Sequence, residues 1–304
     1  MMPKSSLLYP LGESPVLGVS FANVRVLRLD LLGGNAPGNK WFKLQGSIAE
    51  AGRLGLTTLV SFGGAWSNHL HALAATGREL GLRTVGIVRG EEPANPSAML
   101  RDARRWGMEL VYVSRSEYRQ RDQPGYIEEV LTRFGPCLLI PEGGANRAGV
   151  EGCGGIADLL RRAGVSEGRV VLAVGTGTTL AGVANGLGRT PGKNPGPAVV
   201  GISVLKGAAD IEPRIATFTN NNAAPWQVLH DHHCGGYARV SAGMREFIVA
   251  FQQIHGIPLD PVYTGKALYG VHQLIASRAW GEGEPVVVIH TGGLQGRRGF
   301  SWLR

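Results

Sequence analysis

The sequence predicts an α/β fold in which parallel β-sheets are flanked by helices. Short β-branched runs alternate with segments of about 10 to 18 residues that have helical periodicity, and this alternation runs twice along the chain. Strands separated by helices pair in parallel, which is typical of α/β architecture. With 304 residues and 43% hydrophobic content, the chain can form one large unit or two lobes with packed cores.

The first series of elements begins with the strand "VRVLRLDLLG". We expect a helix near residues 41–54, the strand "TTLVSF", a helix from about residue 68 and the strand "TVGIVRG". The amphipathic helix "PSAMLRDARRWG", the strand "ELVYV" and the short strand "CLLIP" follow. The β-branched residues identify the strands, and the scattered arginines identify the solvated faces of helices.

The second series begins with the strand "GRVVLAV". We expect a helix after "GTGTT", the strand "PAVVGISVL" and a helix near residues 207–217. Two helical segments, "SAGMREFIVAFQQIHG" and "GKALYGVHQLIASRAWG", precede the final strand "EPVVVIHTGG". The segments "GRTPGKNPGP" and "TNNNAAP" are expected to be surface loops.

The net charge of +8 favours anionic partners, so nucleic acid is considered first. The arginines are spread over amphipathic helices, and the sequence has no DNA- or RNA-binding motif. We therefore expect no nucleic-acid partner.

No apolar run approaches the roughly 18 residues of a membrane span, and the start of the chain lacks a signal-peptide core, so the expected location is the cytoplasm. Three widely spaced cysteines suggest reduced thiols.

Two Gly-rich motifs follow strands. In "AVGTGTTLAG", residues 173–182, backbone N–H groups, hydroxyls and a helix N-terminus can converge on an anion such as phosphate. The motif is neither a Walker loop nor a Rossmann fingerprint. In "SFGGAWSNHLHALAATG", a helix N-terminus presents N–H groups with a hydroxyl and an amide, which suits a carboxylate or phenolate oxygen. Taken alone, the first motif is equally a tight turn and the second an ordinary N-cap.

Lys40 follows the Gly/Pro-rich turn "GGNAPG" and lies in "GNKWFKL". Alone, it is either a surface charge at the start of a helix or a buried amine placed for covalent chemistry. A lysine that forms a Schiff base must be available as a neutral amine, which a partly desolvated site favours. Lys43 and Lys266 are interpreted as surface or structural charges.

Five motifs occur in order: "GNKWFKL", "GGAWSNH", "GTGTTLAG", "DPVYTGKALYG" and "IHTGG". With them the chain resembles the fold-type II pyridoxal-phosphate (PLP) enzymes, most closely D-cysteine desulfhydrase and 1-aminocyclopropane-1-carboxylate (ACC) deaminase. The resemblance covers nearly the whole chain. It implies a two-domain fold like that of tryptophan synthase β, with a large cofactor domain of residues 1–43 and 148–304 and a small α/β domain of residues 44–147. It also implies a homodimer.

The resemblance implies PLP as cofactor and gives roles to the motif residues. Lys40 matches the lysine that holds PLP covalently and moves protons at the substrate Cα, with Asn39 as its supporting neighbour. Asn68 matches the residue that hydrogen-bonds the 3′ oxygen of PLP. Ser67 and His69 lie where the family binds the substrate carboxylate, and Trp66 lies beside them. The phosphate loop is matched by Thr176, Gly177, Thr178 and Thr179.

Tyr263 matches an active-site tyrosine near the substrate, and Tyr237 matches a second, although it is also interpretable as a core residue. In the deaminases, the tyrosine matched by Tyr263 is followed by a glutamate that faces the pyridine nitrogen, and leucine precedes the C-terminal Gly-Gly. Here these positions are Thr264 and Thr291, as in D-cysteine desulfhydrase. A carboxylate makes the cofactor a deeper electron sink than a threonine does, so Thr264 favours β-elimination over cyclopropane opening.

The resemblance therefore implies β-elimination from a small D-amino acid, with D-cysteine giving pyruvate, ammonia and hydrogen sulfide. Phe42, Trp66 and the ending "LQGRRGF" depart from the family pattern, and Trp66 and Leu294 are expected to reshape the substrate pocket. The alternatives are ACC deaminase, another PLP-dependent amino-acid lyase, and a non-catalytic ligand- or metal-binding protein. The cluster "HDHHC" at residues 230–234 offers metal-ligand types, but adjacent residues on a strand point to opposite faces, so no metal site is expected.

Overall fold

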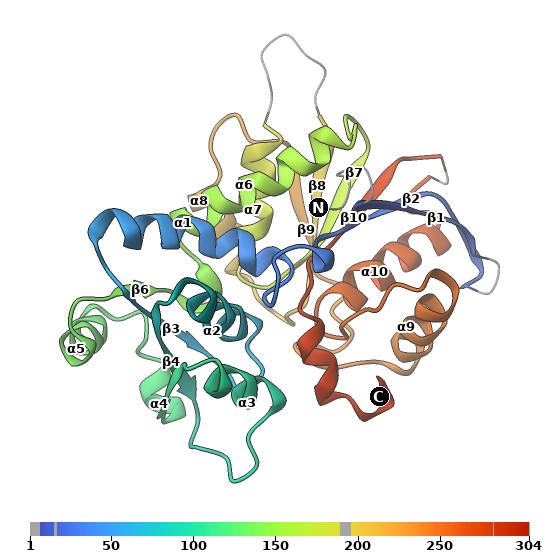
Figure 1. The fold of residues 1–304 in the computed structure, drawn as a ribbon. Helices are drawn as coiled ribbons and strands as arrows, with labels where there is room; N and C mark the ends of the chain where they lie inside the picture. Colours follow the sequence, from blue (N-terminus) through green and yellow to red (C-terminus); the bar gives the residue numbers. More distant parts are fainter. Residues whose placement is uncertain (1–6, 15–16, 189–195, 282, 304) are drawn as a thin grey trace.

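The computed structural model describes residues 7–14, 17–188, 196–281 and 283–303, which build two β-sheets with helices around them (Figure 1). The larger sheet has the strand order β1-β2-β10-β7-β8-β9, and the smaller has the order β5-β4-β3-β6. Within these sheets only β1 pairs antiparallel, with β2, and all other pairs are parallel. The predicted α/β fold with parallel sheets is confirmed.

The larger sheet combines both ends of the described chain. Its strands are β1 (Leu8–Ser14), β2 (Val19–Arg28), β7 (Arg169–Val174), β8 (Ala198–Ser203), β9 (Trp226–Leu229) and β10 (Val286–His290). Helices α6 (Arg147–Arg162), α7 (Thr178–Gly186), α8 (Ile211–Phe218), α9 (Ala242–His255) and α10 (Thr264–Ala276) accompany it. The five residues of β10 are all buried. Strands that are buried along their whole length are expected where both faces of a parallel sheet are covered.

The smaller sheet is built from one continuous stretch. Its strands are β3 (Thr58–Gly63), β4 (Arg83–Arg89), β5 (Glu109–Val113) and β6 (Leu138–Ile140). The helices of this half are α1 (Asn39–Leu54), α2 (Asn68–Leu80), α3 (Ala98–Arg105), α4 (Arg115–Tyr118) and α5 (Pro124–Phe134). Short 3-10 segments are η3 (Leu29–Leu31), η4 (Glu142–Gly144), η5 (Leu294–Gly299) and η6 (Ser301–Leu303).

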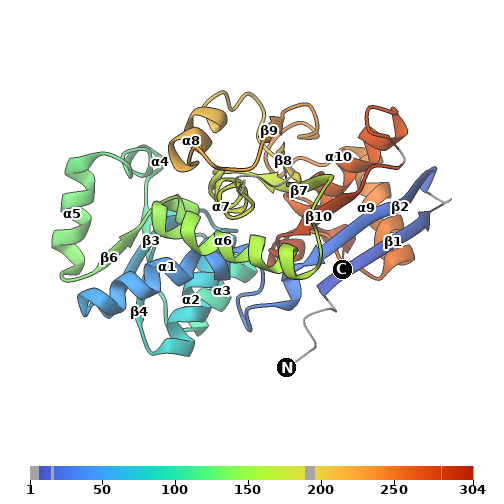
Figure 2. The ribbon, with the colours of Figure 1, turned by 90° about the horizontal axis from the view of Figure 1, so that it is seen from above.

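Helices α1 and α6 lie side by side (Figure 2) and pack backbone to backbone. A Cβ added to Gly152 of α6 would collide with the Phe42 carbonyl of α1, and one added to Gly46 of α1 would collide with the Ala148 carbonyl of α6. Glycine is required at both places because only a residue without a Cβ permits this approach. The contact fixes α1, and with it Lys40, against the larger sheet.

Some elements differ from the expectation. The helix expected near 41–54 begins at Asn39, and the helix expected near 207–217 spans Ile211–Phe218. The strands β1 and β9, helix α5 and most of α6 were not expected. Residues 189–195 of the expected loop "GRTPGKNPGP" lie outside the described residues, whereas "TNNNAAP" connects α8 to β9. The domain boundaries at 43/44 and 147/148 stay a prediction.

Two smaller expectations concern cysteines and membranes. Cys137, Cys153 and Cys234 are all free thiols, and Cys153 is buried. In the part of the chain that the structure describes, no helix has the length and apolar character needed to cross a membrane.

Candidate active site

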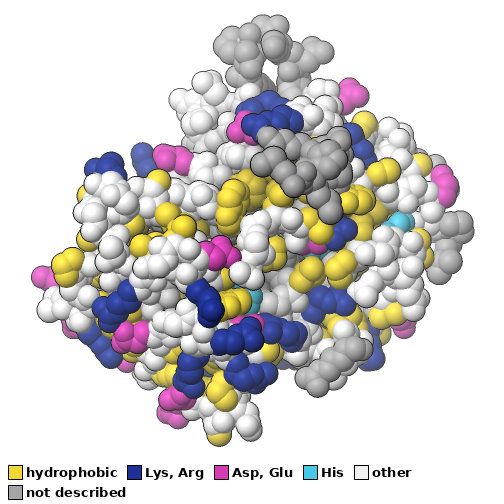
Figure 3. All heavy atoms as spheres, viewed as in Figure 1, with side chains coloured by type: hydrophobic (Ala, Val, Ile, Leu, Met, Phe, Trp, Pro, Cys, Tyr) yellow, Lys and Arg dark blue, Asp and Glu magenta, His cyan; other side chains and the backbone are white. Residues whose placement is uncertain are grey.

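A cavity of about 690 Å³ opens between the two halves of the molecule. Much of its wall is made by residues at or just after the ends of β3, β4, β5, β6, β7, β8 and β10, so it lies at the carboxyl ends of the parallel strands of both sheets. This is where α/β proteins bind ligands, and the volume suits a cofactor or a small molecule. Figure 3 shows Lys and Arg side chains gathering in the lower centre of the face drawn, where the halves meet.

Lys40 enters the cavity from the first turn of α1. Burial lowers the pKa of its amine, while the nearby Cys153 and Asp260 act in the opposite direction. No residue that the structure describes makes a hydrogen bond or ion pair with this amine. The amine is therefore more readily neutral than an ordinary lysine, as nucleophilic chemistry requires.

The turn before Lys40 is held against the end of β10. Asn39 donates its backbone N–H to the Thr291 carbonyl at 3.0 Å. Gly38 has a φ of 105°, and a Cβ there would collide with the same carbonyl. The "GNK" segment thus needs glycine for both its backbone conformation and its contact with β10.

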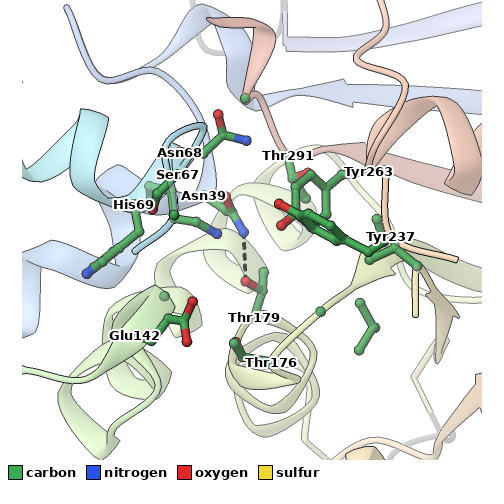
Figure 4. Close-up of a pocket in the computed structure, with 18 of the residues that line it drawn as sticks. Asn39, Ser67, Asn68, His69, Glu142, Thr176, Thr179, Tyr237, Tyr263 and Thr291 are labelled. Carbon is green, nitrogen blue, oxygen red and sulfur yellow. Dashed lines mark hydrogen bonds between the residues drawn. The ribbon is translucent and has the colours of Figure 1, made fainter. Parts of the chain in front are cut away.

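The loop after β7 forms the opposite wall. Gly177 has a φ of 84°, and α7 begins at Thr178, so the first N–H groups of this helix lack intrahelical acceptors. Thr179 accepts a hydrogen bond from the Asn39 amide at 2.8 Å (Figure 4). Thr176 and Thr178 share a hydrogen bond at 3.0 Å. Thr176, Gly177 and Thr179 line the cavity, whereas Thr178 is fully buried outside its wall. Such a loop can bind an anion.

Lys43 lies one turn after Lys40 and also lines the cavity. It is 3% exposed and donates to the Gly143 carbonyl at 2.9 Å and to the Thr176 hydroxyl at 3.3 Å. Burial, and then the charge of Lys40, hold its pKa well below the usual range. Lys266 is fully buried and donates to the Gly236 carbonyl at 2.5 Å. Of the two interpretations, surface charge and structural charge, the structure supports the second for both lysines, because their buried amines donate to backbone carbonyls.

Trp66, Ser67, Asn68 and His69 all line the cavity at the start of α2. Ser67 caps this helix, since its hydroxyl accepts from the Leu70 N–H at 3.2 Å. Figure 4 shows the Asn68 amide nitrogen directed toward the side of the cavity where Thr291 and Tyr263 lie. The expected substrate residues are thus brought together on one wall.

His69 is 2% exposed, and its proton positions follow from its neighbours. The Ser61 hydroxyl donates to the Ile140 carbonyl at 2.7 Å, so it can only accept from His69 Nε2, at 3.0 Å. Nδ1 is then an unprotonated acceptor, and it has no partner in the described structure. Burial, followed by Lys40 and Lys43, lowers the pKa of His69 well below its ordinary value. His69 is a neutral imidazole.

Tyr263 precedes α10 and lines the cavity together with Tyr237. Their ring centroids are 6.3 Å apart in an edge-on arrangement. Burial, with Tyr237 as the second cause, raises the pKa of Tyr263 well above its ordinary value. Tyr263 therefore stays a protonated phenol.

The two threonines that the resemblance connects to the reaction lie in different places. Thr291 lines the cavity. Thr264 does not, because its hydroxyl donates to Asp260 Oδ1 at 2.7 Å and its side chain is 1% exposed. Its assignment as a cofactor contact stays a prediction.

Sequence reasoning missed several charged residues of the cavity wall: Arg89, Arg115, Arg214 and Glu142. Arg89 is the last residue of β4, and Glu142 follows β6. Their places after strands that end at the cavity are the signal that could have identified them. Glu142 is paired with Arg121 at 2.9 Å.

The histidines of "HDHHC" contact side chains of other elements and do not converge on one point. His230 Nε2 contacts Glu212 at 2.6 Å, and His232 Nδ1 contacts Gln273 at 2.9 Å. Over the described ranges, no group of three or more His, Cys, Asp or Glu residues is arranged to hold a metal ion.

Comparison with known proteins identifies the family of the chain. A family model described as "Pyridoxal-phosphate dependent enzyme" matches residues 26–292. The chain belongs to the PLP-dependent enzymes. Two proteins named "Putative 1-aminocyclopropane-1-carboxylate deaminase", from Pyrococcus abyssi and Thermotoga maritima, are 31% and 32% identical to it over 288 residues. The alignments cover 90% of this chain and 85% and 89% of those relatives.

Solved structures agree with this family and fold. An ACC deaminase homologue has a TM-score of 0.77 at 27% identity, over 95% of this PLP enzyme and 90% of that chain. A hydrogen sulfide-producing enzyme from Fusobacterium nucleatum has a TM-score of 0.68 at 14% identity, over 97% and 99% of the two chains, and so shares the fold. The expected PLP-dependent fold-type II enzyme is confirmed.

The cavity residues fit PLP by their chemistry. A neutral lysine amine can bind the cofactor covalently. The loop 175–179 with the α7 N-terminus suits a phosphate, and the Asn68 amide can donate to an oxygen of the ring.

Proposed function

We propose that this PLP enzyme catalyses β-elimination from a small D-amino acid, with D-cysteine as the foremost substrate and pyruvate, ammonia and hydrogen sulfide as products. The observation that carries the proposal is the presence of threonine at two positions, Thr264 and Thr291. In the deaminases that the chain resembles, these positions hold glutamate and leucine. Neither threonine brings a carboxylate to the cavity.

The chemistry of the electron sink connects the first of these positions, Thr264, to the reaction. A carboxylate beside the ring nitrogen of PLP keeps that nitrogen protonated and deepens the sink, whereas a threonine hydroxyl does so weakly. Opening a cyclopropane ring needs the deeper sink. Thiolate is a good leaving group from the β-carbon, so its elimination needs less stabilisation of the carbanion.

The residues of the cavity have the following roles in this proposal. PLP, when bound, accepts the electron density that develops at the substrate Cα. Lys40 holds the cofactor and, after the substrate displaces it, removes the Cα proton, which its lowered pKa favours. Tyr263 is less suited to be the base because its pKa is raised. Ser67 and the N-terminus of α2 hold the substrate carboxylate.

Asn68 donates to the 3′ oxygen of PLP, and the loop 175–179 binds its phosphate. His69 supports the carboxylate wall without carrying charge. After the sulfur leaves, the released 2-aminoacrylate hydrolyses to pyruvate and ammonia. We further propose that the enzyme is a homodimer in the cytoplasm. Light scattering of the purified protein tests the dimer, which should have twice the mass of one chain.

A second candidate is ACC deaminase, because the two curated relatives carry that name. The test is to supply D-cysteine, L-cysteine and ACC separately to the PLP-loaded enzyme and to measure sulfide and the 2-oxo acid formed. Sulfide and pyruvate from D-cysteine alone support the proposal. Product from ACC with none from D-cysteine overturns it. No product from any amino acid favours a protein that binds PLP without turnover.

Thr291→Leu tests the specificity argument. It restores the leucine of the deaminases at a cavity position, and we expect the rate of D-cysteine elimination to fall about tenfold or more. Thr264→Glu, by contrast, places a second carboxylate beside the buried Asp260, so its effect on rate is read only after its stability is measured. An unchanged rate in Thr291→Leu contradicts the role of this position.

A further inference from the structure

The 3-10 segment η5 is fastened to both halves of the molecule. Arg297 donates to the Leu259 carbonyl at 2.5 Å and to the Gln252 side chain at 2.7 Å. Arg298 donates to Asp102 of α3 at 2.6 Å. Gln295 lies between the last strand and these two arginines. Their contacts place it beside the start of α2.

The orientation of the Gln295 amide is set by two groups that each play only one role. The Trp66 carbonyl can only accept, and it lies 3.2 Å from Gln295 Nε2. The Arg298 guanidinium can only donate, and it lies 3.4 Å from Gln295 Oε1. The nitrogen of Gln295 must therefore face α2, and its oxygen must face Arg298.

This orientation decides the orientation of Asn68. Gln295 Nε2 carries a second hydrogen, which it donates to Asn68 Oδ1 at 2.6 Å. Because a donor occupies that side, Asn68 must present its oxygen to Gln295 and its nitrogen to the opposite side. No described residue accepts a hydrogen bond from Asn68 Nδ2. This nitrogen packs on Gly293, where an added Cβ would lie 2.5 Å from it.

We propose that Gln295 is a positioning residue that holds the Asn68 amide with its N–H donors toward the cavity, ready for an oxygen of the cofactor ring. The inference rests on the role of Asn68 proposed above. It gives a purpose to Gln295 within the "LQGRRGF" ending, in which the resemblance connected only Leu294 with the pocket. Arg297 and Arg298 hold the segment that carries Gln295.

Two substitutions separate orientation from simple packing. In Gln295→Met the side chain keeps its length but loses both hydrogen bonds, so Asn68 becomes free to rotate. In Gln295→Glu a carboxylate accepts from Asn68 Nδ2, which turns the Asn68 oxygen toward the cavity. We expect PLP affinity to fall about threefold in the first variant and about tenfold or more in the second.

The measurement is the dissociation constant of PLP, obtained by titrating each apo-protein and following fluorescence quenching. Gln253→Glu is the matched control, since it adds the same charge at an exposed glutamine of α9. We expect its PLP affinity to match that of the wild type. Gln295 lies in a half-buried position, and denaturant midpoints verify that every variant is folded.

A double substitution shows whether Gln295 acts through Asn68. Gln295→Glu should cause less than a twofold further loss in the Asn68→Ala background. Three results would each overturn the proposal. They are an equal loss of PLP affinity in Gln295→Met and Gln295→Glu, a loss in Gln253→Glu equal to that in Gln295→Glu, and a further loss of about tenfold when Gln295→Glu is added to Asn68→Ala. The readout needs no turnover, so failure of D-cysteine as a substrate leaves this test unaffected.

Discussion

Asn39 donates its side-chain amide to the Thr179 hydroxyl at 2.8 Å, which joins the first turn of α1 to the first turn of α7. Asn39 precedes the proposed cofactor lysine, and Thr179 belongs to the proposed phosphate loop. The two ends of the cofactor site are thus held by one buried hydrogen bond.

The first prediction concerns this hydrogen bond. In Asn39→Ala the Thr179 hydroxyl loses its buried partner, and PLP affinity should fall about fivefold, the equivalent of roughly 1 kcal/mol for a buried hydrogen bond. Thr179→Val should have a similar effect. Titration of apo-protein measures both, and in the double variant the losses should not add. Additive losses would show that the residues act independently.

The second prediction concerns the covalent site. Reduction of the PLP-loaded protein with borohydride should fix the cofactor on Lys40, which peptide mass spectrometry locates. Lys40→Ala should carry no label and should lose activity by about a thousandfold or more, since general-base catalysis alone contributes roughly 10² to 10⁴. Lys43→Ala is the matched control and should keep the label on Lys40. Label on Lys43 in the wild type contradicts the assignment.

The third prediction concerns pH and stability. The pKa of His69 is lowered in the folded protein, so below its ordinary value of about 6.5 the unfolded chain binds a proton that the folded chain does not. The free energy of unfolding should therefore decrease as the pH is lowered below about 6.5, by up to about 1.4 kcal/mol per pH unit. His69→Gln can still donate to Ser61 but cannot titrate, so its profile should be flatter. Urea unfolding at pH 5 and pH 7 measures the difference.

The partly buried His71 titrates with the same sign, which is why the wild type is compared with the variant instead of being interpreted alone. Parallel profiles for the wild type and His69→Gln would show that His69 is charged in the folded protein. That outcome would also remove the neutral imidazole from the cavity wall.

The fourth prediction uses two glycines of the same region. Gly38→Ala forces a Cβ against the Thr291 carbonyl at a φ of 105°, and should destabilise the fold by about 2 to 4 kcal/mol. Gly52→Ala lies within α1 with open space around it, and should stabilise by about 1 kcal/mol. Denaturant unfolding measures both. A destabilising Gly52→Ala would count against the described packing of α1.

Much of the fold and site was predictable because the motifs lie where strands end. Lys40, Ser67, Asn68 and Thr176 each follow or begin an element whose carboxyl-end position is implied by a parallel sheet. Lys43 was also within reach, since three residues along a helix return a side chain to nearly the same face. It was missed because a lysine near the start of a helix is usually solvated.

Other parts depended on contacts that no local pattern records. Helix α6 contains several glycines, which weaken a helical pattern, yet one of them, Gly152, is what allows the helix to pack closely on α1. Thr264 is next to Tyr263 in the sequence, but its side chain turns to Asp260 instead of the cavity. Gln295 meets Asn68 only because the C-terminal segment returns to α2.

The order of strands in the larger sheet has a consequence for how the protein is made. Strand β10 pairs with β2 on one side and with β7 on the other, so the sheet cannot be completed until residues 286–290 have left the ribosome. The smaller sheet uses only residues 58–140 and can assemble long before that. During synthesis, β2 therefore stays unpaired on its β10 side, and an unpaired strand edge is a site at which a nascent chain can aggregate.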